Sequence, residues 1–239
     1  SELHTEPKPE RTRGGLLAGF RYVWGRPDLM AVLVMLLLLG AFGFNFAIFI
    51  STMSVPGFQG DASQYGLLTS SMAVGTMCGA LLSARRPVPG MVLMAVSAAC
   101  FGVGVAMAAV MPGPVLFAIV RLFVGPAALP FRAASNSMTQ LTTERSMRGR
   151  VLALRIAVVM GGTPLGAPLI GWVVDNFGAR WALGVGALSG LAATCVAIRY
   201  LLKHRGLRVE REDGRWRLAI DPSPLDTADV RVATGERVT

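Results

Sequence analysis

Five long stretches of the chain contain no Asp, Glu, Lys or Arg, and this pattern constrains the fold more than any other feature. The stretches cover residues 29–60, 62–84, 87–120, 156–174 and 181–198. A helix that crosses the hydrocarbon core of a bilayer needs about 20 mostly apolar residues, and every stretch is close to that length or longer. Only 15% of the residues are charged, whereas soluble domains contain about 25%. The sequence therefore predicts a membrane protein and excludes a water-soluble fold.

Pro, Gly and charged residues divide these stretches into six predicted spans. Lipid offers the backbone no hydrogen-bond partners, so each span is expected to be a helix. The predicted spans are residues 29–52, 65–84, 90–110, 115–137, 151–174 and 181–202. The expected fold class is an all-α membrane protein, with a six-span domain over residues 28–203. A cytoplasmic linker, residues 1–27, precedes it, and a cytoplasmic tail, residues 204–239, follows.

The linker and the tail differ in pattern. Leu16, Leu17, Phe20 and Trp24 recur at helical spacing, and Arg21 lies elsewhere on the helical wheel. This pattern predicts a short helix lying on the inner leaflet, anchored by basic and aromatic residues. An unstructured linker is the alternative. The tail mixes Arg, Glu, Asp and Pro without periodicity, which predicts disorder.

The arginines between the spans give an orientation. If each block crosses the membrane once, every basic loop falls on one side and only Arg180 falls on the other. Cytoplasmic loops carry the excess of Lys and Arg in membrane proteins. We therefore expect a multi-pass protein of the cell membrane with both termini in the cytoplasm.

Several function classes are excluded by residue type. The formal net charge is +9, but the basic residues lie between apolar blocks and at the ends, not on one face of a nucleic-acid binder. The only two lysines are Lys8 and Lys203, and neither lies in a phosphate-binding loop of the G-x-x-x-x-G-K type. Both histidines lie outside the apolar blocks, and the three cysteines are isolated. We expect no metal site, no cofactor, no disulfide framework and no enzyme.

A weak internal repeat relates the second and fifth predicted spans. Small or short residues recur every four positions in both, namely Ser71, Gly75, Gly79 and Ser83, and Thr163, Ala167, Gly171 and Asp175. Small residues at this spacing let helices approach closely in lipid. The two spans are the middle helices of two three-helix units, which must cross in opposite senses because three is odd. Inverted triplets are typical of secondary transporters, although small-residue patterns occur in most multi-span proteins.

Arginines within the spans are candidates for contact with a small molecule, because charge inside a membrane is costly. Arg121 lies about seven residues into the fourth span, roughly 10 Å along a helix. It either faces a water-filled cavity and attracts an anion, or reaches the outer interface through its long stem. Arg132 is a weaker cavity candidate, because it and Arg155 lie near the inner boundary, where reaching for the interface is favoured. No acidic residue lies deep in any span.

Asn45 lies past the middle of the first span, between Phe42 and Phe46. An apolar, aromatic wall with one or two polar groups is how small-molecule sites are usually built. The alternative is that the phenylalanines face lipid and Asn45 bonds to a neighbouring helix. In the fifth span, Gly162, Pro164 and Gly166 should bend or loosen the helix, as a rocking element or as a static kink.

Three motifs give the chain a recognisable family resemblance. One runs from Arg148 and Arg150 through residues 161–168 to Asp175 and Arg180. A second, Gly79 to Arg86 with Ser83, Arg85 and Arg86, resembles the loop motif G-x-x-x-D-[RK]-x-G, with Ser83 where that motif has its acid. The third is residues 19–24. Together they resemble the C-terminal half of a major facilitator superfamily transporter, in the branch of enterobactin exporters and related efflux proteins.

The resemblance implies that the six spans are numbers seven to twelve of twelve. It implies that the first and fourth spans, with Asn45 and Arg121, line a central cavity, and that the second and fifth contact an N-terminal six-span half, a partner absent from this chain. The expected function is secondary active efflux of a small molecule by alternating access, coupled to protons as an antiporter. The alternative is a transport-incompetent six-span fragment or partner subunit that only assembles with another membrane protein.

Overall fold

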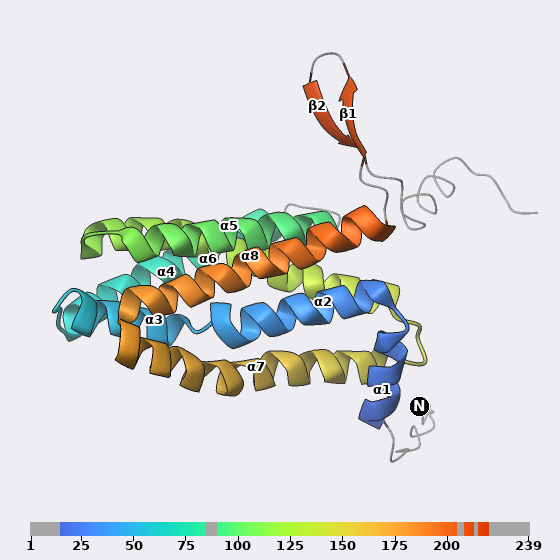
Figure 1. Cartoon of the computed structure of the whole chain (residues 1–239), viewed down its shortest axis with the longest axis horizontal. Helices are drawn as coiled ribbons and strands as arrows, with labels where there is room; N and C mark the ends of the chain where they lie inside the picture. The colour runs from blue at the N-terminus through green and yellow to red at the C-terminus, as the bar shows by residue number, and fades with distance from the viewer. Residues whose placement is uncertain (1–14, 85–89, 205–207, 213–214, 220–239) are drawn as a thin grey trace, which may run out of the picture. The chain divides into compact units, whose positions relative to one another are not determined.

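A computed structural model describes residues 15–84, 90–204, 208–212 and 215–219. The chain divides into two compact units, Ser1–Ala197 and Ile198–Thr239. The first unit begins with the short helix α1, Gly15–Trp24, in the segment where the sequence predicts a helix. The elements that follow it are α2 (Pro27–Leu38), η1 (Leu39–Gly43), α3 (Phe46–Thr52), η2 (Met53–Gly57), α4 (Ala62–Ala84), α5 (Met91–Val110), α6 (Pro114–Thr142), α7 (Arg148–Phe177) and α8 (Ala179–His204), which continues into the second unit (Figure 1).

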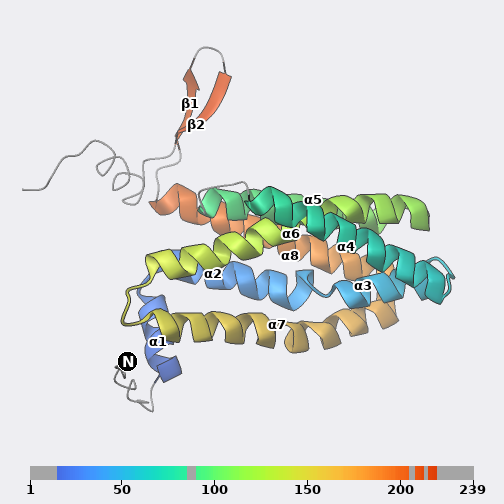
Figure 2. The ribbon, with the colours of Figure 1, turned by 180° about the vertical axis from the view of Figure 1, so that it is seen from behind.

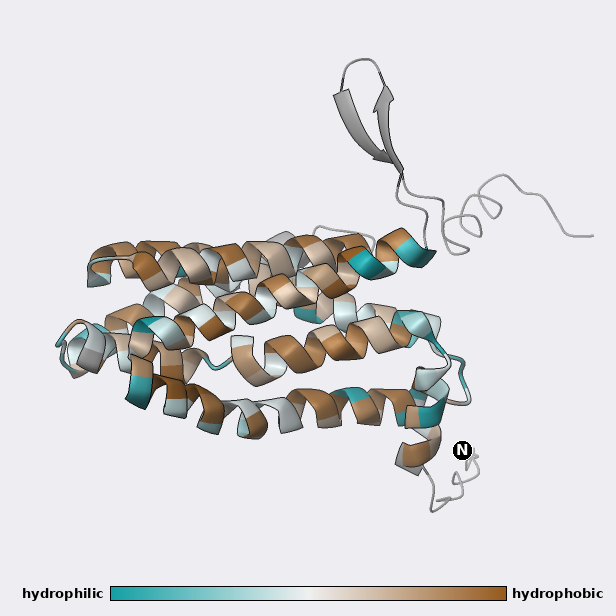
Figure 3. Cartoon of the chain, in the orientation of Figure 1, coloured by the Kyte–Doolittle hydropathy of each residue, from teal (hydrophilic) through white to brown (hydrophobic). Residues whose placement is uncertain are grey.

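Within the described residues, five helical segments are long and apolar enough to cross a membrane. They are Pro27–Val55, Met91–Val110, Pro114–Thr142, Arg148–Phe177 and Ala179–His204. These segments correspond to the first, third, fourth, fifth and sixth predicted spans, and apolar residues dominate along them (Figure 3). The second predicted span is helix α4, which has 23 residues but is not among the five. The chain is an all-helical, multi-pass membrane protein in this region, and the sixth crossing stays a prediction.

The first span is not one continuous α-helix. After Leu38 it widens into the π-helical segment η1, stops at Phe44 and Asn45, and resumes as α3. The backbone N–H of Phe44 donates to the carbonyl oxygen of Leu39 at 2.7 Å, and the Asn45 side chain donates to the carbonyl oxygen of Ala41. Gly40 and Gly43 lie in the widened segment, where glycine lowers the cost of leaving helical geometry. The sequence predicts this span, residues 29–52, but not its break.

Glycines bring α4 and α7 into close contact with neighbouring helices. In α4, a Cβ on Gly79 would lie 2.5 Å from Pro126 Cα of α6, and one on Gly75 would overlap the carbonyl oxygen of Leu122. In α7, a Cβ on Gly166 would overlap the backbone of Ala41 in η1. Helix α4 runs beside α6, and α7 runs beside α2 and α3, in both views (Figures 1 and 2).

The packed stripe of α7 is displaced by one residue from the stripe that the repeat predicted. Thr163 and Asp175 are exposed, and a Cβ on Gly171 would meet nothing within 4 Å. Gly162 and Gly166 are buried instead, one turn apart. Residues 161–163 are all small, so the sequence contains two adjacent small-residue stripes, and only the neighbouring helix distinguishes them.

The helix prolines do not interrupt their helices. Pro126 and Pro130 lie inside the 29-residue helix α6, and Pro164 and Pro168 inside the 30-residue helix α7. The prediction that the glycines and prolines around Pro164 loosen α7 is therefore not visible as a break. Neighbouring helices, hydroxyl side chains and local adjustments commonly accommodate proline in transmembrane helices.

The second unit holds regular structure where the sequence analysis expected a disordered tail. Strand β1, Arg208–Glu212, pairs antiparallel with β2, Arg215–Ala219. Its register places Glu210 opposite Arg217 and Glu212 opposite Arg215. Opposite charges in register stabilise a strand pair, a signal that was legible in the sequence. The remainder of the predicted tail, most of the linker, and Arg85 and Arg86 lie outside the described residues.

Candidate functional site

Arg121 of α6 is one of the largest fully buried side chains in the described chain, with 2% of its surface exposed. Its Cζ lies 5.5 Å from the ring centroid of Phe117 and 5.6 Å from that of Phe46 in α3. Its Nη2 lies 2.8 Å from Sδ of Met72 in α4, and its Nε is buried without a hydrogen-bond partner. The guanidinium is therefore enclosed by three helices.

The partners of Arg121 compensate its charge only weakly. Ring faces attract a cation, and a thioether sulfur is a weak acceptor. Among the described residues, the ion pair present joins Arg26 and Asp28 at the start of the first span and does not involve Arg121. A buried cation without a carboxylate is costly, and inside a membrane such a group marks a functional position.

Four phenylalanine rings form an aromatic cluster beside the break in the first span. The cluster consists of Phe44 at the break, Phe46 of α3, Phe101 of α5 and Phe131 of α6. Ring centroids lie 5.6 Å apart for Phe44 and Phe101, 5.9 Å for Phe44 and Phe46, 6.0 Å for Phe46 and Phe101, and 6.3 Å for Phe44 and Phe131. These separations are within the range of favourable ring contacts. The cluster thus joins three spans around a break in the backbone.

Arg132 contacts the aromatic cluster at Phe44, at the opposite end of the cluster from Arg121. Its Cζ lies 5.2 Å from the ring centroid of Phe44. It follows Arg121 by 11 residues, which places both on nearly one face of α6, roughly 16 Å apart along the helix axis. The row Arg121, Phe46, Phe44, Arg132 is therefore continuous, each member in contact with the next.

Arg155 of α7 joins this end of the row. Its Nη2 donates to Oγ of Ser135 at 3.1 Å and to the carbonyl oxygen of Arg132 at 3.3 Å, and its Nε is buried without a hydrogen-bond partner. Ser135 is fully buried. From the sequence, Arg155 is expected only to reach the interface, because nothing in a sequence links residues 23 positions apart on different helices.

The structure separates the predicted cavity residues into two groups. Phe46, Arg121 and Arg132 lie in the row just described. Asn45 is 4% exposed and donates to its own span, at Ala41, so its amide supports the break in the backbone. Phe42 is half-buried and makes no ring contact with the cluster among the described contacts. Sequence reasoning missed Phe44, Phe101 and Phe131, which are spread over three helices.

The residues of the predicted loop motifs lie near helix ends. Arg148, the first residue of α7, is exposed, as are Asp175 and Arg180 at the other end. Arg150 is half-buried, and its backbone lies 3.3 Å from where a Cβ on Gly19 of α1 would stand. Ser83 falls in α4, and its side chain is outside the described part. Among the contacts of the described residues, Arg148, Arg150, Asp175 and Arg180 have none with the row.

Arg26, which follows α1, connects the start of the first span to the end of α6. The Nη2 atom of Arg26 donates to the carbonyl oxygen of Thr142 at 3.0 Å, and the Nε atom of Arg26 lies 3.3 Å from a carboxylate oxygen of Asp28. The hydrogen bond with Asp28 raises the pKa of Arg26 above its ordinary value, more than burial lowers it. The hydroxyl of Tyr22 also accepts the backbone N–H of Glu144 at 3.4 Å.

The family model for transmembrane secretion effectors, a group of the major facilitator superfamily, matches residues 3–223. The chain belongs to this family. The family consists of membrane transporters and is not an enzyme class. No curated protein matches the chain.

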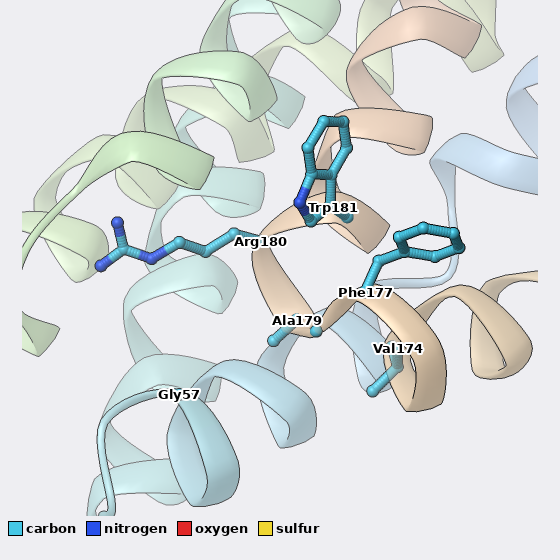
Figure 4. A pocket seen from close by; sticks show the side chains of 7 residues that line it. Gly57, Val174, Phe177, Ala179, Arg180 and Trp181 are labelled. Carbon is cyan, nitrogen blue, oxygen red and sulfur yellow. The ribbon is translucent and has the colours of Figure 1, made fainter.

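Two surface hollows lie apart from the row. One, of about 330 Å³, is lined by Gly57 and by the turn between α7 and α8. There Gly178 adopts the left-handed φ of 91°, and Phe177 and Trp181 flank the turn (Figure 4). Exposed aromatic side chains at helix ends are typical of membrane–water interfaces. The other, of about 520 Å³, is an apolar groove between α5 and α6.

Proposed function

We propose that this secretion effector is a secondary active transporter that exports a small molecule by alternating access. The observation that carries the proposal is Arg121, a buried and unpaired cation beside an aromatic cluster at a broken membrane helix. Broken helices and ionisable residues inside the membrane are features of transporter binding sites. The proposed cargo site is the row from Arg121 to Arg132.

The helix pairing supports six spans arranged as two inverted triplets. Helix α4, second in its triplet, packs on α6, the first helix of the other triplet. Helix α7 packs on the first span in the reciprocal way, through Gly162 and Gly166. The third helices, α5 and α8, meet where a Cβ on Gly190 would lie 2.6 Å from Gly102 Cα. Such reciprocal pairing is what a two-fold relation between inverted repeats produces.

The exposure of α7 supports assembly with a second six-helix half. Only 17% of its most apolar window is buried, compared with 56% for the first span. The large apolar side chains of α7 that are exposed are Ile156, Met160, Leu165, Leu169, Trp172 and Phe177. We propose that this exposed surface of α7 contacts an N-terminal half and that the termini of the present chain are cytoplasmic. Coupling to protons then depends on carboxylates of that other half, because helices α5 to α8 carry no acidic residue except Asp175 near the end of α7.

The test compares cells that make the full-length protein with cells that do not. A panel of radiolabelled anionic, neutral and cationic compounds is loaded, and retention is followed with and without a protonophore. We expect faster loss of at least one compound, abolished by the protonophore. If no compound of the panel leaves faster, export is contradicted, and the alternative of a subunit that only assembles with another protein is favoured.

A further inference from the structure

We infer that Arg132 and Arg155 form a second anion-binding site at one end of the aromatic cluster, and that the cargo is an organic anion with a flat apolar body. The inference rests on the proposed export function and adds the chemistry of the cargo. It follows from the contacts of two arginines on different helices.

The Arg155 side chain reaches the turn of α6 that begins at Arg132. Arg155 donates to the carbonyl oxygen of Arg132 and to Oγ of Ser135, three residues later. The Arg132 guanidinium lies over Phe44. Arg155 is half-buried and directs its donors into α6. Arg132 is exposed and places its guanidinium over a ring of the cluster.

The charge of this pair is not balanced by nearby acids. The sequence has no Asp or Glu between residues 62 and 143 or between 145 and 174, which covers α4 to α6 and most of α7. Two cations near one another repel, and each is stabilised by an anion. A carboxylate suits the site because guanidinium groups bind its two oxygens with paired, charge-assisted hydrogen bonds. The Nε of Arg155 is buried without a hydrogen-bond partner, so the polar groups of this guanidinium are not fully satisfied within the chain.

The aromatic cluster determines the rest of the cargo. A flat apolar body that extends from the carboxylate meets the rings of Phe44 and Phe46, which favour stacked or edge contacts. Arg121 lies roughly 16 Å further along α6, which is too far for one small molecule to bind both cationic ends at once. The two cationic ends of the row therefore bind the anion one after the other. Arg132 and Arg155 bind it first, on the cytoplasmic side, and Arg121 then binds it further inside the membrane.

The experiment uses the full-length protein in nanodiscs and a matched pair of probes, 2-naphthoate and its uncharged amide, 2-naphthamide. Equilibrium binding of the tritiated probes is measured by scintillation proximity. We expect naphthoate to bind about tenfold more tightly than naphthamide, the size of one charge-assisted interaction. Arg132→Gln and Arg155→Gln should each weaken naphthoate binding about tenfold and leave naphthamide binding unchanged.

Two further variants separate this role from a structural one. Arg155→Lys keeps the charge and should retain most naphthoate binding. Arg145→Gln removes an exposed arginine of the loop between α6 and α7 and should change nothing. Equal binding of the two probes, no naphthoate binding by the wild type, or no effect of Arg155→Gln would each overturn the inference. If the cell assay still shows export, the failure concerns the cargo chemistry alone; if no compound is exported, the proposed function fails as well.

Discussion

At the scale of the residue, Arg121 combines high burial with weak partners. It contacts two rings and a sulfur atom, and its Nε has no hydrogen-bond partner. Burying a charge without a carboxylate partner opposes folding, so an apolar residue at position 121 would stabilise the fold better than arginine does. The arrangement is understandable if the charge serves a ligand, as strained or costly groups at functional sites often do.

This cost gives a prediction about stability. Arg121→Gln removes the buried charge, so we expect the melting temperature of the purified protein to stay the same or to rise. Scanning fluorimetry in detergent measures it. Arg180→Gln, which changes an exposed arginine, is the control and should have no effect. A clear drop for Arg121→Gln alone would show that the cation holds the helices together.

Asn45 should behave in the opposite way. Its side chain donates to the carbonyl oxygen of Ala41 at the break, where the helix leaves that acceptor free. Asn45→Ala is expected to cost about 1 kcal/mol of stability, the net value of one hydrogen bond. Affinity for cargo should change little, because the amide already has its partner. Chemical denaturation and probe binding on the same samples separate the two effects. Loss of binding at full stability would place Asn45 in the cargo site.

At the scale of the element, α7 approaches the first span closely. A Cβ on Gly166 would overlap the backbone of Ala41, whereas one on Gly161, also in α7, would meet nothing within 4 Å. Gly166→Ala should therefore lower the melting temperature strongly, since two backbones must separate. Gly161→Ala should be neutral or slightly stabilising, because alanine is the better helix former. Equal effects of the two substitutions would contradict the packing described.

The elements also show which features sequence can predict. The helical spans can be predicted from the length of the uncharged stretches alone. A single segment surrounded by lipid satisfies its backbone hydrogen bonds only as a helix. The break at Phe44 depends on a π-helical turn that two glycines permit but do not require. The aromatic cluster draws Phe44, Phe101 and Phe131 from three helices, and no spacing in one sequence brings them together. The displaced stripe of α7 has the same origin, because the partner helix decides which small residues are buried.

At the scale of the whole molecule, the number of crossings is the open structural prediction. If α4 crosses the membrane like the other spans, the segments before and after it lie on opposite sides. Single cysteines replace Asp61, Gly90, Gly113 and Ser146 in a protein whose Cys78, Cys100 and Cys195, all exposed, are changed to serine. A membrane-impermeant maleimide should label positions 61 and 113 in intact cells, and positions 90 and 146 only after permeabilisation. Labelling of 61 and 90 from a common side would remove α4 from the spans.

The measurement that tests the account most directly is transport by the reconstituted full-length protein. Proteoliposomes receive either the wild type or Arg121→Gln, and counterflow of a compound identified in the cell assay is followed. The account predicts that the variant, folded and inserted to the same extent, loses transport by about tenfold or more, because one charged contact to the cargo is gone. Transport at the wild-type rate by the variant would contradict the claim that the buried arginine and the rings beside it form the cargo site.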